Sequence, residues 1–451
     1  MRPKPPSKAS NEDLFRSRLE AMLDDRHELV RLARLIDWDR FDAAFGGLYV
    51  DKTGRPGLPT RLMAGLHLLQ HAKGLSDDAV CAQWLENPYF QSFCGETHFQ
   101  HRLPLDRSSM TRWRARIGQD KLEVLLAETL AAALRAKAVG SGTFERITID
   151  TTAQTKAVAH PTDSGLLLRA VQWLNRFARQ HRLVLRQSFV RLAVRSRREV
   201  SRLIHTSGHK QALREVRRMR TYVGRLHRDI GRKIAGQPDL ETAFRPVGEP
   251  IARLLAQKVG DSSKLYALHA PEVECIAKGK ARTRFEFGVK ASFAVTNARA
   301  GGGQFIVGAQ ARPGLPYDGH TLQSQIAQVE RLTGASVERA YVDRGYRGHG
   351  LTTPQVYLSN TRGIASPTIK RELRRRSAVE PIIGHMKADG KLERHWLKGA
   401  NGDAINVVLV AAGHNIRLLL AWLKLLCALI RAAILAASQR TPITTNRKAF
   451  T

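Results

Sequence analysis

Three carboxylates stand where they could act together, although they lie far apart along the chain. Asp150 ends the strand that we predict in TFERITIDTT, Asp343 ends the strand predicted in VERAYVD, and Glu380 lies on the helix predicted in RRRSAVEPIIGHMK. In an open α/β sheet, reactive side chains gather at the carboxyl ends of the strands. Carboxylate oxygens bind divalent cations, and a pair of such ions stabilises the attacking and leaving oxygens of phosphoryl transfer. We therefore predict that these residues are catalytic and hold two Mg²⁺ ions, for which Mn²⁺ can substitute.

Basic side chains surround the predicted glutamate. On one helix, at about 100° per residue, Arg376 and Lys387 lie within about 40° of Glu380, so the three share a face. Such a face places a cation on each side of the carboxylate. We predict that Arg376 and Lys387, together with Arg344 beside Asp343, contact nearby phosphates. The alternative is a surface ion pair between Arg376 and Glu380, worth a few tenths of a kcal/mol.

Each carboxylate also has a simpler structural explanation. Asp150 precedes two threonines and Asp343 precedes an Arg-Gly pair, so both fit turns. Asp318, in PYDGH, also precedes a predicted helix. It is either a turn and N-cap residue or a replacement for Asp343 in the metal-binding set.

The chain carries a large excess of positive charge. It has 451 residues, 73 Lys and Arg against 40 Asp and Glu, a net charge of +33 and a hydrophobic fraction of 43%. This composition argues against disorder over most of the length and allows several domains. A field of this sign attracts phosphates, which favours double-stranded DNA as the partner. The segment Leu166–Ala235 has 19 basic and 3 acidic residues with apolar residues at helical spacing, so we predict amphipathic helices that contact phosphates.

No segment predicts export or membrane insertion. The first residues, MRPKPPSKAS, are basic and rich in proline and do not form the apolar core of a signal peptide. The most apolar stretch, residues 404–437, is interrupted by charged and polar residues, so we expect a buried or amphipathic helix. Four scattered cysteines have no zinc-site or disulfide spacing. These features predict a protein of the reducing cytoplasm.

The first 140 residues have a helical pattern throughout. Ser76, followed by two aspartates, fits the cap and first turn of one short helix, and Ser108 fits the cap of a second. The second helix carries three arginines near its start: Arg112, Arg114 and Arg116. The pair has the outline of a DNA-binding helix-turn-helix. The alternative is a connector in a helical bundle with solvated arginines.

The rest of the chain alternates strands and helices. Apolar residues alternate from Phe285 to Val295, which predicts a half-buried strand. A turn at Gly301–Gly303 leads to a partner strand in QFIVGAQA, and a helix in DGHTLQSQIAQVERLT ends at Gly334. Strands in VERAYVD and QVYLS follow. Without the basic helical segment, the order is three antiparallel strands, a crossover helix and two strands, which predicts an RNase H-like α/β core with a mixed five-stranded sheet.

Four segments follow from these patterns. We expect an all-α N-terminal DNA-binding domain, an RNase H-like catalytic core in two parts, a basic helical insertion between them, and C-terminal helices with a tail. Their predicted bounds are 1–140 for the N-terminal domain, 141–164 and 262–400 for the core, 165–261 for the insertion and 401–451 for the C-terminal segment.

The motifs around the three carboxylates resemble those of the DDE transposases of bacterial insertion sequences, most closely the insertion-sequence-five family. The resemblance rests on TIDTT, AYVDRGYRG and the spacing Arg376-x3-Glu380-x6-Lys387. The family motif has a tyrosine three residues before the arginine, where this chain has Leu373. Other similar stretches, such as GRPGLPTRLMAGLHLL and KGANGDAINVVLVAAGHNIRLLL, extend the resemblance from about residue 53 to 420. Better-known relatives carry a β insertion before the glutamate helix, whereas the insertion here is basic, helical and placed after the first strand.

The resemblance implies a transposase, a metal-dependent nucleotidyl transferase that cleaves DNA at insertion-sequence ends and transfers the strands into target DNA. It also implies a homodimer on the terminal inverted repeats, working at the nucleoid in a bacterial cytoplasm. Two alternatives stay open. A non-catalytic DNA-binding or architectural protein with a decayed core needs no carboxylates on three separate elements. An RNase H-like repair nuclease cuts structured DNA without regard to terminal repeats.

Overall fold

The computed structural model describes residues 17–49, 56–206, 208–277, 284–361, 363 and 366–438. The first part of the chain is helical: α1 Leu19–Met22, α2 Glu28–Leu35, α3 Trp38–Gly46, α4 Thr60–Ala72, α5 Asp77–Glu86, α6 Pro88–Phe93 and α7 Ser108–Arg135. After the short turn η2 (Ser141–Thr143), β1 (Arg146–Thr155) is followed by α8 Asp163–Gln180, α9 Val190–Ile204, α10 His209–Ile234 and α11 Pro238–Ala256. The remaining elements are β2 Glu274–Ala277, β3 Phe285–Thr296, β4 Ile306–Arg312, α12 Asp318–Thr333, β5 Arg339–Val342, η3 Arg344–Tyr346, β6 Gln355–Leu358, α13 Pro367–Arg375, η4 Arg376–Ala378, α14 Val379–Ala388 and α15 Gly399–Ser438.

One mixed sheet forms the centre of the protein. β1 pairs antiparallel with β3, and β4 pairs antiparallel with the other edge of β3. On its other side β1 pairs parallel with β5, which pairs parallel with β6. The strand order β4-β3-β1-β5-β6 has the three antiparallel and two further strands that the sequence predicts. A sixth strand, β2, was not predicted, because its four residues are too few to show alternation.

The first strand is longer than predicted. We expected it to end at Asp150, but β1 continues to Thr155 because its second half stays paired with β3. Its parallel pairing with β5 ends earlier, at Thr148 and Tyr341. Asp150 therefore lies in the middle of β1, two residues after Thr148, the last residue of β1 that pairs with β5.

Local signals placed several helix ends correctly. The Ser76 hydroxyl accepts a hydrogen bond from the Ala79 amide at the start of α5, as a capping serine does. Gly334 ends α12 with a positive φ of 69°, which glycine adopts without strain. Ser108 is not the predicted cap: it is the first residue of α7, and the Asp106 carboxylate accepts a hydrogen bond from its amide.

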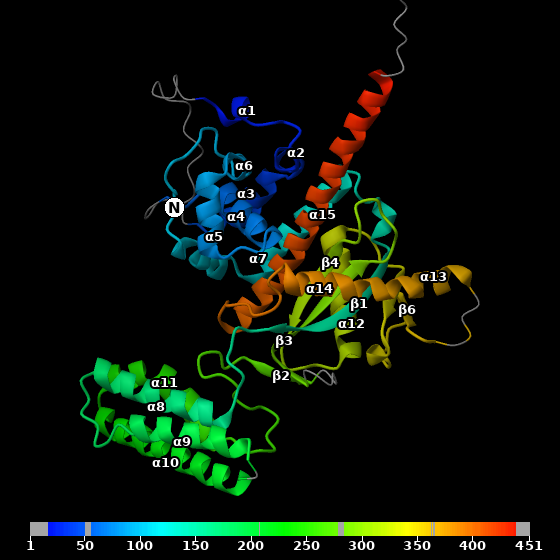
Figure 1. Ribbon diagram of the computed structural model, residues 1–451. Helices are drawn as coiled ribbons and strands as arrows, with labels where there is room; N and C mark the ends of the chain where they lie inside the picture. The colour runs from blue at the N-terminus through cyan, green and yellow to red at the C-terminus, as the bar shows by residue number, and fades with distance from the viewer. Residues whose placement is uncertain are drawn as a thin grey trace, which may run out of the picture.

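A single apolar core joins the N-terminal helices, the sheet and α15. α15 runs between the N-terminal helices and the sheet (Figure 1), and it packs against α4, α7 and β4. By length and composition it is the one helix in the described ranges that could span a membrane, but 83% of its most apolar window is buried inside the protein. This agrees with the buried helix predicted from its interrupting polar residues.

The helices between β1 and β2 have a core of their own. Figure 1 shows α8–α11 as a bundle standing away from the sheet. Apolar residues at helical spacing, among them Leu174, Met219 and Val223, are fully buried inside it. The prediction of amphipathic helices in this basic segment is therefore confirmed, and many of its arginines lie on the outside.

Candidate active site

The pairing register of β1 and β5 brings Asp150 next to Asp343. Thr148 of β1 lies opposite Tyr341 of β5 in the parallel pair. Two residues beyond this last pair, continuation of the register puts Asp150 opposite Asp343 on the same face, and both carboxylates lie close to the buried Tyr346. Two carboxylates that are 193 positions apart in the sequence thus become neighbours at the end of β5.

The face that carries these aspartates is covered by α13 and α14. Thr148 and Tyr341, two residues before the aspartates, point to the same face. The Asn297 side-chain amide donates to the Thr148 hydroxyl (2.8 Å) and to the Glu372 carbonyl of α13 (3.1 Å). The Tyr341 hydroxyl donates to the Glu372 carboxylate. α14, the helix with Glu380, packs against β1.

Each aspartate is held by local contacts. One Asp150 oxygen, Oδ1, accepts a hydrogen bond from the Thr151 amide (2.8 Å), and the other, Oδ2, lies 3.9 Å from the Arg376 guanidinium. Both of these side chains are more than four-fifths buried. Asp343 caps the turn η3, where its Oδ1 accepts from the Gly345 amide (2.9 Å). Arg376 is therefore a counter-ion at the carboxylate pair.

The helix around Glu380 is not continuous. α13 ends at Arg375, the 3₁₀ turn η4 covers residues 376–378, and α14 begins at Val379. The sequence predicted that the helix begins or kinks at Glu380, and the break lies one residue earlier. Glu380 and Lys387 both lie in α14, as predicted, but Arg376 lies in the tighter 3₁₀ turn before it and so is not on the same regular helix.

Glu380 itself is exposed in the first turn of α14. Within the described part of the chain, Arg376 forms its ion pair with Asp150 and none with Glu380. The alternative of an Arg376–Glu380 surface pair is therefore not what this structure contains.

The two other predicted phosphate contacts, Lys387 and Arg344, have different partners in the structure. Lys387 lies 3.5 Å from the Glu286 carboxylate of β3. Arg344 is exposed in η3 and donates to the Asn360 carbonyl (3.5 Å). Arg376 thus lies beside Asp150, Arg344 follows Asp343 directly in the sequence, and Lys387 is paired with Glu286 of β3.

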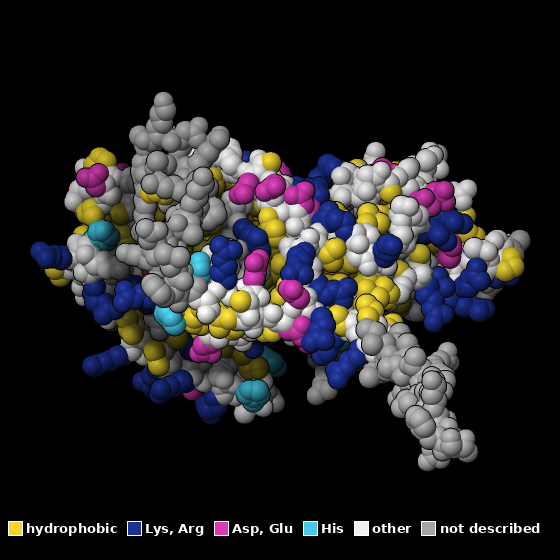
Figure 2. Space-filling view, turned by 90° about the horizontal axis from the view of Figure 1, so that it is seen from above, with side chains coloured by type: hydrophobic (Ala, Val, Ile, Leu, Met, Phe, Trp, Pro, Cys, Tyr) yellow, Lys and Arg dark blue, Asp and Glu magenta, His cyan; other side chains and the backbone are white. Residues whose placement is uncertain are grey.

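Part of the basic surface beside the site, the exposed face of α13, was not predicted from the sequence. Lys370, Arg371 and Arg374 are exposed on α13, and Lys and Arg side chains gather over that end of the molecule (Figure 2, right). Leu373, which stands where a tyrosine is expected from the resemblance, lines a surface hollow of about 420 Å³ with Asn360 and Arg374.

Asp318 also lies at the site. Its Oδ2 and Asp343 Oδ1 both border Gly345. The sequence left Asp318 open as an N-cap or as a replacement for Asp343. It is not an N-cap, because the start of α12 has no side-chain cap, and its place in the metal-binding set stays a prediction. Tyr346, buried beneath these aspartates, was missed altogether, and its place in DRGYRG was the only available signal.

Hard oxygen donors from Asp150 and Asp343, next to a helix that carries Glu380, fit the chemistry of Mg²⁺. Among the described residues, however, no group of three His, Cys, Asp or Glu side chains already converges on one point. The exposed Glu380 side chain would have to turn toward the two aspartates to complete the site.

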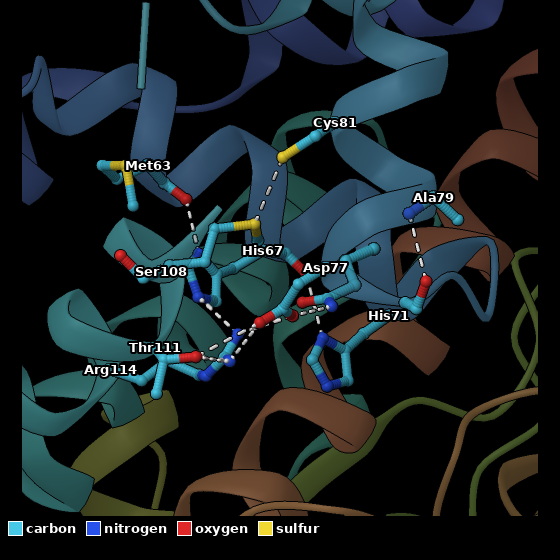
Figure 3. A network of polar contacts seen from close by, with 12 residues as sticks. Met63, His67, His71, Asp77, Ala79, Cys81, Ser108, Thr111 and Arg114 are labelled. Carbon is cyan, nitrogen blue, oxygen red and sulfur yellow. Dashed lines mark hydrogen bonds and ion pairs between the residues drawn. The ribbon is translucent and has the colours of Figure 1, made fainter. Parts of the chain in front are cut away.

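One N-terminal arginine is not on the surface. Arg114 forms a two-pronged ion pair with Asp77 of α5 (2.6 and 3.0 Å) and lies 3.2 Å from His67 Nε2 of α4, as Figure 3 shows. Its side chain is only 5% exposed. Arg114 therefore ties α4, α5 and α7 together and is not available for DNA. Arg112 and Arg116 remain exposed.

The histidines of this network predict a loss of stability in mild acid. Burial above all lowers the pKa of His67 to about 3 and that of His71 to about 4, from an ordinary 6.5. The unfolded chain therefore binds protons at these histidines near pH 6.5, whereas the folded chain does not bind them until about pH 4. The free energy of unfolding is therefore greatest above pH 6.5 and falls as the pH falls. We expect the free energy of unfolding to decrease by about 1 kcal/mol per pH unit for each histidine.

Urea unfolding at pH 7, 6 and 5 measures this effect. His71→Gln should be less stable than wild type at pH 7 but should lose less stability between pH 7 and pH 5. Equal slopes for the variant and the wild type would show that His71 titrates normally in the folded protein.

The order and directions of the strands define the class of fold: a mixed α/β sheet of the RNase H-like kind. Two parts of the chain match family models. Residues 17–116 match a family described as "Transposase domain (DUF772)" and residues 353–420 match one described as "Transposase DDE domain".

A curated relative matches as well. The chain is 52% identical over 205 residues to "Uncharacterized protein ORF8 in nfe locus" of Rhizobium meliloti, a match that covers 46% of this chain and 98% of the relative. No solved structure matches. The chain belongs to the same family as this relative and is an insertion-sequence transposase of the DDE type. Glu380 lies inside the second matched segment, whereas Asp150 and Asp343 lie between the two segments.

Proposed function

We propose that Asp150, Asp343 and Glu380 are the catalytic carboxylates of this transposase and hold two Mg²⁺ ions, with Mn²⁺ as a substitute. The observation that carries the proposal is the parallel register of β1 and β5, which makes Asp150 and Asp343 neighbours. α14, which carries Glu380, packs on β1, and this packing supports the proposal that Glu380 turns inward to become the third carboxylate. The reaction is cleavage of DNA at the ends of the element and transfer of the strand into target DNA.

The protein's own side chains have separate tasks in this scheme. Carboxylate oxygens of the three residues hold the ions, which when bound lower the pKa of an attacking water or hydroxyl and neutralise charge on the phosphate. Arg376 balances Asp150 in the metal-free protein and, with Arg344 and the basic face of α13, holds the DNA backbone.

DNA contacts extend beyond the catalytic site. The exposed Arg112 and Arg116 of α7 and the arginine-covered helices α8–α11 provide basic surfaces for the terminal inverted repeats and the target. We place the chain in the insertion-sequence-five family on its Arg-x3-Glu-x6-Lys spacing, acting as a homodimer on DNA at the bacterial nucleoid.

A plasmid that carries the element's own flanking sequences tests the proposal. Purified protein should nick it at the element ends in Mg²⁺ or Mn²⁺ and leave it intact in EDTA. Retained DNA binding without metal-dependent nicks would support the architectural alternative. Equal cutting of a branched substrate that has no terminal repeats would support the repair nuclease.

A further inference from the structure

Asp318 is held at the active site by a close junction between the start of α12 and the turn after β5. The Tyr317 hydroxyl donates a hydrogen bond to the Arg347 carbonyl. At Gly319 a Cβ would lie 3.3 Å from the Tyr346 carbonyl, so glycine lets the helix start directly against the turn. The position of the Asp318 backbone is thus fixed by contacts on both sides of it.

Gly345 separates the Asp318 and Asp343 carboxylates. A Cβ at Gly345 would lie 3.0 Å from Asp343 Oδ1 and 3.5 Å from Asp318 Oδ2. Both carboxylates therefore border one small space, and the lack of a side chain at Gly345 keeps it open.

The Asp318 carboxylate has no role in capping α12, because the start of that helix has no side-chain cap. Its Oδ1 instead lies 3.2 Å from the Lys290 ammonium of β3. Lys290 also donates to the Pro316 carbonyl (2.9 Å). About four-fifths of both charged side chains is buried, so Asp318 is turned toward the interior.

Two fully buried hydroxyl groups lie beneath this acidic group. Tyr346 and Ser292 are 0% exposed, and neither hydroxyl has a well-formed hydrogen bond to a described residue, although they lie close to each other. The Tyr346 hydroxyl lies close to the Asp318, Asp150 and Asp343 carboxylates. Buried hydroxyl groups without partners mark places where an ion or water completes the bonding.

We propose that Asp318 is a fourth carboxylate of the metal site, and that Lys290 is its counter-ion in the metal-free protein. This inference rests on the proposed metal-dependent function. Asp343 lies between two other aspartates, Asp150 and Asp318, and these like charges repel one another. Arg376 balances Asp150, and Lys290 balances Asp318. A divalent cation between Asp343 and Asp318 takes over the balancing charge from Lys290, and carboxylates are the ligands that such a cation prefers.

Mn²⁺ binding to the full-length protein without DNA tests this role, measured by the loss of the free Mn²⁺ paramagnetic resonance signal. Asp318→Asn should weaken Mn²⁺ binding by about 10-fold or more. Mutation of a residue that only supports a metal ligand already weakens metal binding by about 10–100-fold. Asp163→Asn is the matched control, because Asp163 is an exposed aspartate in the first turn of another helix, α8, and should bind Mn²⁺ as wild type does. Lys290→Met removes the competing cation and should strengthen binding.

The outcomes separate this inference from the proposed function. Weakened binding in both Asp318→Asn and Asp343→Asn, with unfolding temperatures in EDTA close to wild type, supports the fourth carboxylate. Wild-type binding in Asp318→Asn, with weakened binding in Asp343→Asn, overturns the inference and leaves the proposed function standing. Wild-type binding in both variants overturns the metal site itself.

Discussion

Asparagine in place of either Asp150 or Asp343 should lower Mg²⁺-dependent cleavage of an end-bearing duplex by more than about 100-fold. Loss of a residue that merely supports a metal ligand typically costs about 10–100-fold, and loss of the ligand itself must cost more. Because the β1–β5 register places both carboxylates at one site, the double variant should be little worse than either single variant. Single-turnover rates on a labelled duplex measure this.

The controls for this prediction follow from the structure. Asparagine keeps the shape of aspartate and can still accept the hydrogen bonds that Thr151 and Gly345 donate, so unfolding temperatures should stay close to wild type. Asp163→Asn, on the surface of α8, should cleave normally. Losses that multiply in the double variant would mean that the two aspartates act independently, which contradicts a shared site.

Removal of positive charge from α10 should weaken DNA binding and its dependence on salt. Four exposed arginines lie within about 80° around this helix: Arg214, Arg217, Arg225 and Arg228. If each contacts one phosphate, replacing all four with glutamine lowers the slope of log affinity against log salt by about 3 to 4. Fluorescence anisotropy between 50 and 200 mM salt would show the loss as affinity that is lower and less sensitive to salt.

The same bundle offers a matched control. Arg202 and Arg218 are equally basic and exposed but are paired with Glu199 and Glu215 (2.5 and 2.6 Å). Replacing this pair with glutamine should change the salt slope less per residue than replacing the unpaired arginines. An unchanged slope in the fourfold variant would show that α10 faces solvent and does not contact DNA.

The features predicted well from the sequence are local ones. Ser76 and Gly334 mark helix ends through bonds and backbone angles set within a few residues, and the alternation from Phe285 to Val295 depends only on neighbours. The succession of strands and helices along the chain was also predicted, because each element carries its own hydrophobic pattern. These parts of the fold needed no knowledge of distant contacts.

The features that failed depend on contacts that the sequence does not show. β1 runs past Asp150 because β3 is long enough to pair with it. Arg114 looked like a solvent-facing arginine, but its partner Asp77 lies 37 residues away on another helix. An arginine that is buried beside a carboxylate stabilises the packing of helices and does not contact DNA. Hydrophobic periodicity alone cannot distinguish such a buried arginine from a solvent-exposed one.

The candidate site was predictable in part for the same reason. The residue types and the strand-end positions pointed to Asp150 and Asp343, but only the parallel register shows that they are neighbours. The position of Asp318 follows from the junction of α12 with the turn at Gly345, which joins segments that the sequence places 27 residues apart.

Anomalous diffraction from crystals of the protein bound to Mn²⁺ and an end-bearing duplex tests the central claim most directly. The claim is that Asp150, Asp343 and Glu380 form one metal site. We predict Mn²⁺ peaks between the Asp150 and Asp343 carboxylates, with the Glu380 side chain turned inward to bind one of the ions at 2.0–2.3 Å, roughly the range for such oxygen ligands. Mn²⁺ bound elsewhere, or a site in which Glu380 still points to solvent while DNA is cut, would contradict the account.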